Sequence, residues 1–122
     1  MIVIKSRVRV LDNSGGRFAE VLNILSKSQR ASAKVGDVLV VSVKKIIPHK
    51  KVEKGTVYKA IVVRIRNQIF RYGGIFIRFE FSGIILLNSK KVMIGTRVLG
   101  IVSQELRKIG CLKILALAPS VV

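Results

Sequence analysis

The segment 59–87 constrains the fold of this chain more than any other. It reads KAIVVRIRNQIFRYGGIFIRFEFSGIILL, a series of short runs rich in Ile, Val and Phe that are broken by Gly73-Gly74 and Ser82-Gly83. β-Branched and aromatic residues are enriched in strands, and paired glycines supply the positive φ angles of hairpin turns. The segment therefore predicts three strands joined by turns, over 57–66, 75–81 and 84–87.

The chain before this segment shows a similar pattern. Alternating basic and apolar residues predict a half-buried strand at 6–11, and apolar runs predict strands at 18–25 and 38–47. Polar and Gly-containing breaks separate them, and 26–34 reads as an exposed loop. About six short strands, with turns roughly every eight to twelve residues, are typical of a small closed barrel.

The last third of the chain loses this regular alternation. The stretch 103–108 resembles a helical turn that Ser103 can cap and Gly110 can end. We expect the apolar run 112–117 to form a last strand, and the tail from Pro119 to form one helical turn. The 122 residues thus predict one domain, with a barrel over about 1–88 and a C-terminal appendage over about 89–122.

Charge is the second constraint, and it concerns partners rather than fold. The chain carries 23 Lys and Arg residues against 6 Asp and Glu residues, a formal net charge of +17. A compact domain with this charge repels itself unless a polyanion neutralises part of it. Nucleic acid is the first candidate for that polyanion, and an anionic membrane surface is the second.

The basic residues concentrate in the middle of the chain. Residues 44–78 include ten Lys and Arg residues and a single acid, Glu53. Ordinary soluble surfaces mix both signs of charge, so this distribution favours polyanion binding over a merely solvated surface. The residues that we predict to face phosphates are Arg7, Arg9, Arg17, Lys44, Lys45, Lys50, Lys51, Lys54, Arg64, Arg66, Arg71 and Arg78.

Strand periodicity assigns a face to each residue of 57–66. Because successive side chains point to opposite sides of a strand, Arg64 and Arg66 share one face, which we expect to be cationic and exposed. Ile61, Val63 and Ile65 share the other face, which we expect to point into the core.

The elements that carry the charge indicate which polyanion is bound. A membrane-surface binder typically presents a basic amphipathic helix with aromatic anchors, whereas the basic stretch here is strand-like and Trp is absent. Modules that read single-stranded RNA expose aromatic side chains, which Phe70, Tyr72 and Phe76 could provide, while Phe79 and Phe81 fit the core equally well. Broad phosphate contact with a folded RNA fits best, and we expect no membrane partner.

Little in the sequence supports catalysis. The single His, His49, lies among lysines and suits a surface or phosphate contact. The single Cys, Cys111, lies in an apolar context typical of a small core residue, and one His with one Cys falls short of a zinc site. We therefore expect no enzymatic activity, no metal and no cofactor.

No secretory signal or membrane-spanning run is visible. The apolar start of the chain, residues 1–4, is followed at once by charges and is too short for a signal. We expect that the protein stays where it is made or that a presequence has been removed.

A series of short motifs gives the whole chain a family resemblance. In order along the sequence they are Asp12-Asn13-Ser14-Gly15, Val35-Gly36-Asp37, Ile47-Pro48, Lys51-Val52-Glu53-Lys54-Gly55, Lys59-Ala60-Ile61-Val62-Val63-Arg64, Ile77-Arg78-Phe79, Leu86-Leu87-Asn88, Ile94-Gly95-Thr96-Arg97, Glu105-Leu106-Arg107 and Leu117-Ala118-Pro119. Each motif alone is a weak signal. In this order and spacing, the chain resembles the universal ribosomal protein uL14 (L14) family, of bacterial or organellar type.

The resemblance implies both a fold and a function. The implied fold is mainly β: a small five-stranded antiparallel β-barrel with a β-ribbon and a short C-terminal helical segment. The implied function is that of a structural constituent of the large ribosomal subunit, bound to its rRNA at the subunit interface. There the family contributes to an intersubunit bridge with small-subunit rRNA, beside ribosomal proteins L3 and L19.

The resemblance also implies a docking site for a ribosome-silencing factor, and the matching positions here are Thr96, Arg97 and Lys113. The Ile-, Val- and Lys-rich composition is typical of an AT-rich organelle genome, so we expect a mitochondrial ribosome in the mitochondrial matrix. A plastid or the bacterial cytoplasm is the alternative location. A free-standing regulator that acts away from the ribosome is the competing function, and sedimentation with large subunits distinguishes the two.

Overall fold

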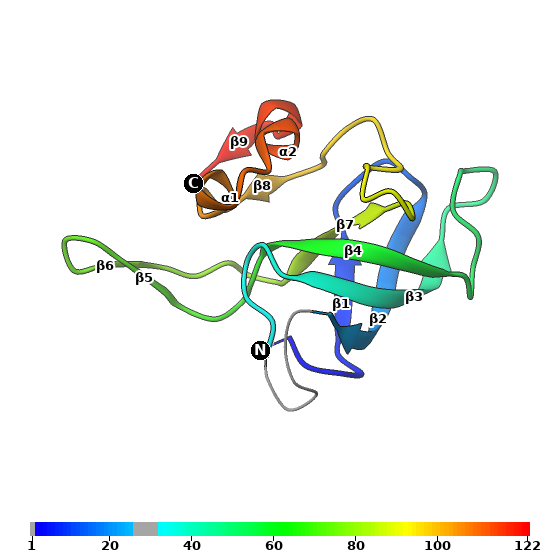
Figure 1. Ribbon diagram of the computed structural model, residues 1–122, viewed down its shortest axis with the longest axis horizontal. Coiled ribbons are helices and arrows are strands. Elements are labelled where there is room, and N and C mark those ends of the chain that lie inside the picture. The colour runs from blue at the N-terminus through cyan, green and yellow to red at the C-terminus, as the bar shows by residue number, and fades with distance from the viewer. Residues whose placement is uncertain (1, 26–31) are drawn as a thin grey trace.

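The computed structural model describes residues 2–25 and 32–122. In this part of the chain, a closed barrel is formed by β1 (Arg7–Val10), β2 (Gly16–Ile24), β3 (Val38–Ile46), β4 (Val57–Arg64) and β7 (Gly83–Leu87), joined in that order (Figure 1). Neighbouring strands are antiparallel, except that β1 and β7 close the barrel as a parallel pair. The predicted five-stranded barrel is confirmed, and most of the loop predicted over 26–34 lies outside the described residues.

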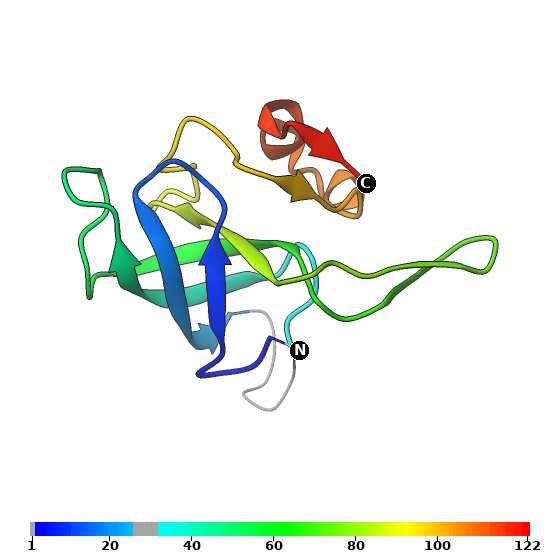
Figure 2. The same cartoon turned by 180° about the vertical axis from the view of Figure 1, so that it is seen from behind.

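A two-stranded ribbon extends away from the barrel. It consists of β5 (Ile69–Arg71) and β6 (Ile75–Ile77), which Figures 1 and 2 show reaching outward on one side. The turn between them uses Gly73 and Gly74, whose φ angles of 89° and 76° are those that a hairpin turn needs. The strand predicted over 75–81 is therefore shorter than expected, because the chain leaves the ribbon after Ile77 to rejoin the barrel at β7.

The C-terminal segment lies above the barrel in Figure 1. It contains β8 (Ile101–Val102), α1 (Leu106–Ile109), α2 (Leu112–Leu117) and β9 (Ser120–Val121), and β8 pairs with β9 in parallel. The strand predicted over 112–117 is wrong, because this run forms a helix. Ile114 is buried, and Cys111, Leu115 and Ala118 are packed against the second core, a spacing of three and four residues that places all four on one face of a helix. The helical turn predicted from Pro119 is also wrong, because those residues pair with the distant β8.

The ends of helix α1 agree only in part with the sequence prediction. Gly110 ends it in the left-handed conformation, with φ of 91°, as expected. Glu105, and not Ser103, stands at its start, and the buried Ser103 hydroxyl has no hydrogen-bond partner among the described residues.

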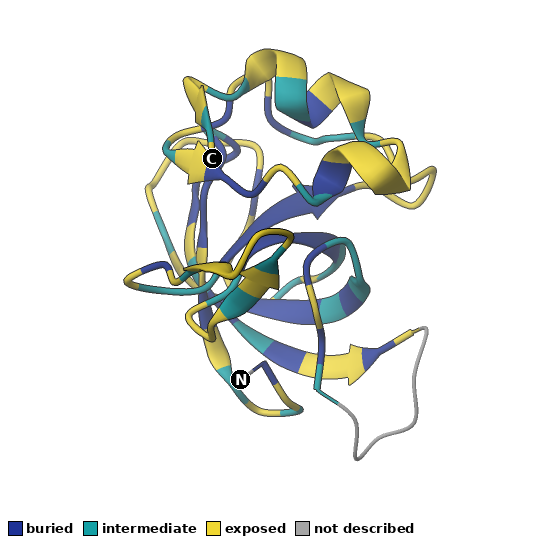
Figure 3. Ribbon diagram, turned by 90° about the vertical axis from the view of Figure 1, so that its left-hand side faces the viewer, coloured by how far each residue is buried: buried dark blue, intermediate teal, exposed yellow. Residues whose placement is uncertain are grey.

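Strand β4 separates two apolar cores. Ala60 and Val62 belong to the cluster inside the barrel, whereas Ile61 and Val63 belong to a second cluster that includes Leu106 and other residues of the C-terminal segment. The prediction that Ile61 and Val63 are core residues is confirmed, although they face this second core. Figure 3 shows the largely buried strands of the barrel below the largely exposed C-terminal helices, with the exposed ribbon in front.

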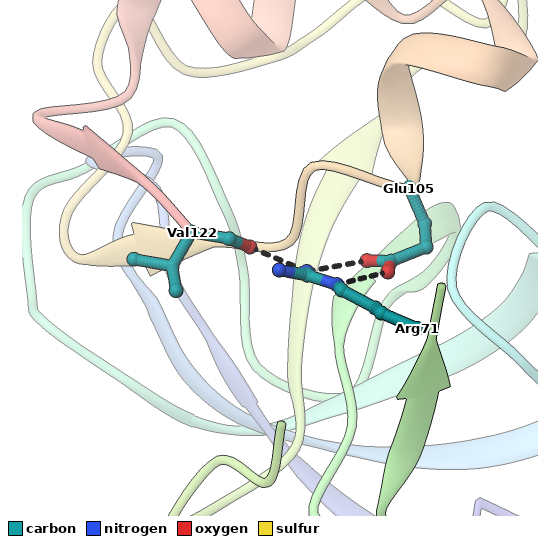
Figure 4. A network of polar contacts seen from close by, with 3 residues as sticks. All are labelled: Arg71, Glu105 and Val122. Atoms are coloured by element: carbon teal, nitrogen blue, oxygen red, sulfur yellow. Dashed lines mark hydrogen bonds and ion pairs between the residues drawn. The ribbon is translucent and has the colours of Figure 1, made fainter. Parts of the chain in front are cut away.

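A charged contact ties the ribbon to the C-terminal segment (Figure 4). Arg71 Nε donates a hydrogen bond to Glu105 Oε1 at 2.8 Å, and Arg71 Nη2 donates to Glu105 Oε2 at 3.1 Å and to the backbone oxygen of Val122 at 2.7 Å. Burial raises the pKa of the Glu105 carboxyl, but hydrogen bonding and the charge of Arg71 outweigh it and hold that pKa below its ordinary value. A bidentate pair of this kind fixes orientation, so it holds the end of β5 next to the turn against the C-terminal segment.

We expect the Arg71–Glu105 contact to stabilise the fold less as the pH falls. A depressed carboxyl pKa contributes stability that is present above the ordinary value of 4.5 and is lost as the pH falls through the folded-state value. Urea unfolding should therefore show Glu105→Gln to be less stable than wild type at neutral pH, and the two stabilities should converge as the pH falls below the ordinary value of 4.5. Glu53→Gln, at an exposed carboxyl, is the matched control, and a Glu105→Gln deficit that persists in acid contradicts this account.

Candidate nucleic-acid interface

Four of the predicted basic residues converge on one groove at the outside of the barrel. The groove, termed the basic groove, has a volume of about 570 Å³ and is lined by Ser6, Arg7, Arg9, Phe18, Lys45, Arg66, Phe81 and Ser82. Among these described lining residues none is acidic. The cations come from three separate parts of the chain: β1, β3 and the segment after β4.

The register of the strands explains this convergence. The turn after β1 sets Arg9 opposite Phe18, and the pairing of β2 with β3 sets Phe18 opposite Lys45. Directly opposed residues lie on the same face of a sheet, so these three side chains form a row across the outside of the barrel. Arg7 shares this face because it precedes Arg9 by two positions.

Arg66 completes the groove from the opposite side. Its backbone N–H donates a hydrogen bond to Ser82 Oγ at 3.1 Å, which holds the start of the ribbon against the segment leading into β7. This contact places a guanidinium from after β4 beside those of β1.

Phe81 is stacked between two arginines. The Cζ atom of Arg9 lies 4.0 Å from the centroid of the Phe81 ring, and the Cζ atom of Arg64 lies 3.9 Å from it. Both distances are well within the range of a cation–π interaction. Arg9 is exposed, whereas Arg64 is buried and its Nη1 donates to the backbone oxygen of Ile101 at 3.2 Å. Burial, and then the charge of Arg9, lowers the pKa of Arg64.

The structure divides the predicted phosphate-facing residues into two groups. Those that are exposed are Arg7, Arg9, Arg17, Lys44, Lys45, Lys50, Lys51, Lys54, Arg66 and Arg78. The other two are engaged within the protein, Arg64 against Phe81 and Arg71 with Glu105. The expectation that Arg64 shares an exposed face with Arg66 is wrong, because Arg64 is only 8% exposed at the end of a strand that the C-terminal segment covers.

A second basic hollow lies at the turn between β1 and β2. It has a volume of about 470 Å³ and is lined by Asn13, His49, Lys50, Lys51 and Thr96. Gly15 allows the turn and the lysine loop to approach, because its φ is 112° and a Cβ at this position would collide with the Lys50 side chain.

Asn13 holds the chain segment that carries Thr96 and Arg97. Its Oδ1 accepts hydrogen bonds from the backbone N–H of Thr96 at 2.8 Å and of Arg97 at 3.0 Å, and its Nδ2 donates to Thr96 Oγ1 at 2.9 Å. Thr96 and Arg97 are exposed, and so is Lys113 on α2, which lies on the same side of the barrel as this segment (Figures 1 and 2).

Asp12 stabilises the turn that carries Asn13. Its Oδ1 accepts hydrogen bonds from the N–H and the hydroxyl of Ser14, and its Oδ2 accepts one from the N–H of Leu86 at 3.2 Å. Burial raises the pKa of the Asp12 carboxyl, an effect that these hydrogen bonds oppose. The Asp12-Asn13-Ser14 motif therefore has a structural explanation: Asp12 ties the turn to β7, and Asn13 ties it to the segment at Thr96.

Several residues that build these sites were not among the site residues predicted from the sequence. Phe18 lines the basic groove, Asn13 positions Thr96 and Arg97, and Glu105 pairs with Arg71. Phe18 could have been found by pairing the first two strands across the turn at 12–15. Phe79 is buried, as a core residue would be, whereas Phe81 is half-buried and lines the groove.

The described residues offer little for catalysis. Within 2–25 and 32–122, no three His, Cys, Asp or Glu side chains gather into a group that could hold a metal ion. Burial raises the pKa of the Cys111 thiol, which disfavours the nucleophilic thiolate, and this side chain packs against the second core. No helix in the same residues is long and apolar enough to cross a membrane.

A small closed barrel with an outward groove of arginine, lysine and phenylalanine side chains is typical of a protein that binds nucleic acid. The family model described as ribosomal protein L14p/L23e matches residues 1–122, and the chain belongs to this family. The family is that of a structural, non-enzymatic constituent of the large ribosomal subunit that binds rRNA. The resemblance drawn from the sequence motifs is thereby confirmed.

We expect Asn13→Ala to loosen the segment at Thr96 and Arg97 while leaving the barrel folded. The variant removes the acceptor of two backbone hydrogen bonds, each contributing about 1 kcal/mol, so amide hydrogen exchange at both residues should accelerate about tenfold or more. Asn13→Asp keeps an acceptor oxygen in place and should preserve most of the protection. Wild-type exchange rates in the alanine variant would show that Asn13 does not hold this segment.

Proposed function

We propose that the protein is anchored to large-subunit rRNA through the basic groove and the basic residues around it. The convergence of Arg7, Arg9, Lys45 and Arg66 in a groove without acidic lining supports this role most directly. Such contacts fix the position of a protein on folded RNA without reading its sequence. To the same surface we assign the other exposed residues that were predicted to face phosphates: Arg17, Lys44, Lys50, Lys51, Lys54 and Arg78.

Arg64 and Arg71 contribute to this interface indirectly, through contacts within the protein. Arg64 lies under Phe81, on which Arg9 is stacked, and Arg71 sets the ribbon against the C-terminal segment. Their role is to position the side chains and elements that meet RNA.

Binding to large-subunit rRNA should weaken steeply as salt is raised, because each neutralised phosphate releases counterions. Replacing Lys45 or Arg66 with Ala removes one phosphate contact. Each variant should therefore reduce the magnitude of the slope of log affinity against log salt concentration by about 1. Lys90→Ala, in an exposed loop away from the groove, is the control and should keep the wild-type slope. An affinity that does not change with salt would exclude phosphate anchoring.

We also propose that the segment carrying Thr96 and Arg97 faces the small subunit. Both side chains are exposed, and Asn13 holds the backbone N–H groups of both residues. This arrangement suits a contact with another macromolecule. The family resemblance implies an intersubunit bridge with small-subunit rRNA here, beside ribosomal proteins L3 and L19. It also implies docking of a ribosome-silencing factor on Thr96, Arg97 and Lys113.

Reversing the charge at Arg97 tests this second surface. Arg97→Glu should weaken subunit joining or silencing-factor docking by about tenfold or more, while the chain still enters the large subunit, because placing a like charge against an anionic partner costs several kcal/mol. Arg97→Lys, which keeps the charge, is the matched control. Sucrose-gradient profiles report both quantities, and if incorporation fails before joining does, Arg97 contacts large-subunit rRNA instead.

The compartment is a separate proposal. The Ile-, Val- and Lys-rich composition supports a mitochondrial ribosome, with a plastid or bacterial ribosome as the alternative. Fractionation of the source cells should place the protein with the large subunits of mitochondrial ribosomes. Recovery with another class of ribosome would overturn the mitochondrial assignment, and recovery from the soluble pool alone would favour a free-standing regulator.

A further inference from the structure

The basic groove has features that contact with a phosphate backbone does not require. Two phenylalanines, Phe18 and Phe81, lie among its cations. We propose that the groove binds a single unstacked nucleotide of rRNA, with its base on the guanidinium of Arg9 and its flanking phosphates on Arg7, Lys45 and Arg66. This inference rests on the proposed anchoring role of the groove and names the part of the RNA that enters it.

A stacked column supports the base-binding part of the proposal. Arg64, Phe81 and Arg9 follow one another, with Cζ-to-centroid distances of 3.9 Å and 4.0 Å on either side of the ring. Arg64 is fixed at the buried end by its hydrogen bond to the oxygen of Ile101. Arg9 forms the exposed end of the column and lines the groove, so its planar guanidinium is preoriented by the ring. Unpaired RNA bases stack on arginine planes as they do on aromatic rings.

The charge of the column favours an anion beside it. Two guanidinium groups share one ring, and the Nε of the buried Arg64 has no hydrogen-bond partner among the described residues. Burying a cation without full compensation is costly, and a nearby phosphate offsets part of that cost. Glu80 is a nearby counter-charge to Arg64, but it does not line the groove.

The shape of the groove suits one nucleotide better than a duplex. Its volume of about 570 Å³ falls in the range of small-molecule sites, and it is concave. Phe18 lies between Arg9 and Lys45 in the row across β1, β2 and β3, and the Cζ atom of Arg9 is 5.8 Å from its ring. A base on Arg9 would therefore have an apolar wall beside it and cations at both ends of its sugar–phosphate chain.

The other exposed aromatic residues are less suited to this task. Phe70, Tyr72 and Phe76 lie on the ribbon and are largely exposed. The arginine among them, Arg71, is paired with Glu105 and with the oxygen of Val122. In the basic groove, aromatic side chains occur together with cations that form no ion pair within residues 2–25 and 32–122.

Three RNA hairpins that differ at one position test the proposal. The first contains a single bulged adenosine, the second an abasic ribose at the same position, and the third no bulge. The abasic hairpin keeps the phosphates and removes only the base. Wild-type protein should bind the adenosine bulge about tenfold more tightly than the abasic one, the gain expected from stacking one base. Fluorescence anisotropy measures the affinities across a salt series.

Two charge-preserving variants separate stacking from charge. Arg9→Lys should abolish the preference for the base, whereas Arg107→Lys, at an exposed arginine of α1 that does not line the groove, should keep it. Equal wild-type affinity for the adenosine and abasic bulges overturns the inference, and this comparison needs no variant. If those affinities still fall steeply with salt, phosphate anchoring stands without the nucleotide site, whereas salt-insensitive binding removes both.

Discussion

Burial of strand β4 on both faces is the interaction on which the rest of the structure depends. Its residues Ala60 and Val62 complete the core of the barrel, while Ile61 and Val63 hold the C-terminal segment against the outside of the same strand. Each such side chain contributes about 1.5–3 kcal/mol of burial energy, apart from the smaller alanine. Because the strand ends at Arg64, the same burial fixes the inner end of the Arg64–Phe81–Arg9 column and hence the wall of the basic groove.

Three of the acidic residues form hydrogen bonds or ion pairs within the protein. Asp12 holds the first turn, Asp37 accepts a hydrogen bond from the N–H of Lys34 at 2.7 Å, and Glu105 pairs with Arg71. Half of the 6 acids thus make structural contacts, which leaves the positive charge of the outer surface largely uncompensated. A net charge of +17 opposes compaction, and contact with rRNA phosphates relieves it, so stability and function depend on the same partner.

The barrel could be predicted from the sequence because its signals are local. Alternation at Arg7 and Arg9 and the glycine turn of the ribbon specify strands and hairpins within a few residues. The errors arose where distant segments decide the structure. The helix at Leu112–Leu117 and the burial of Arg64 both depend on how the C-terminal segment packs against β4, and β9 depends on pairing with β8. The basic residues of the groove were predicted, but not their convergence: Phe18 joins them through strand register, and Phe81 through the path of the chain between β6 and β7.

The central claim is that the basic groove is the place where this protein meets large-subunit rRNA. A density map of the assembled large subunit tests it most directly. The account predicts RNA phosphate oxygens within about 2.7–3.2 Å of the side-chain nitrogens of Arg7, Lys45 or Arg66. A map in which the groove is filled by protein or solvent, while rRNA contacts only the ribbon or the C-terminal segment, would contradict it.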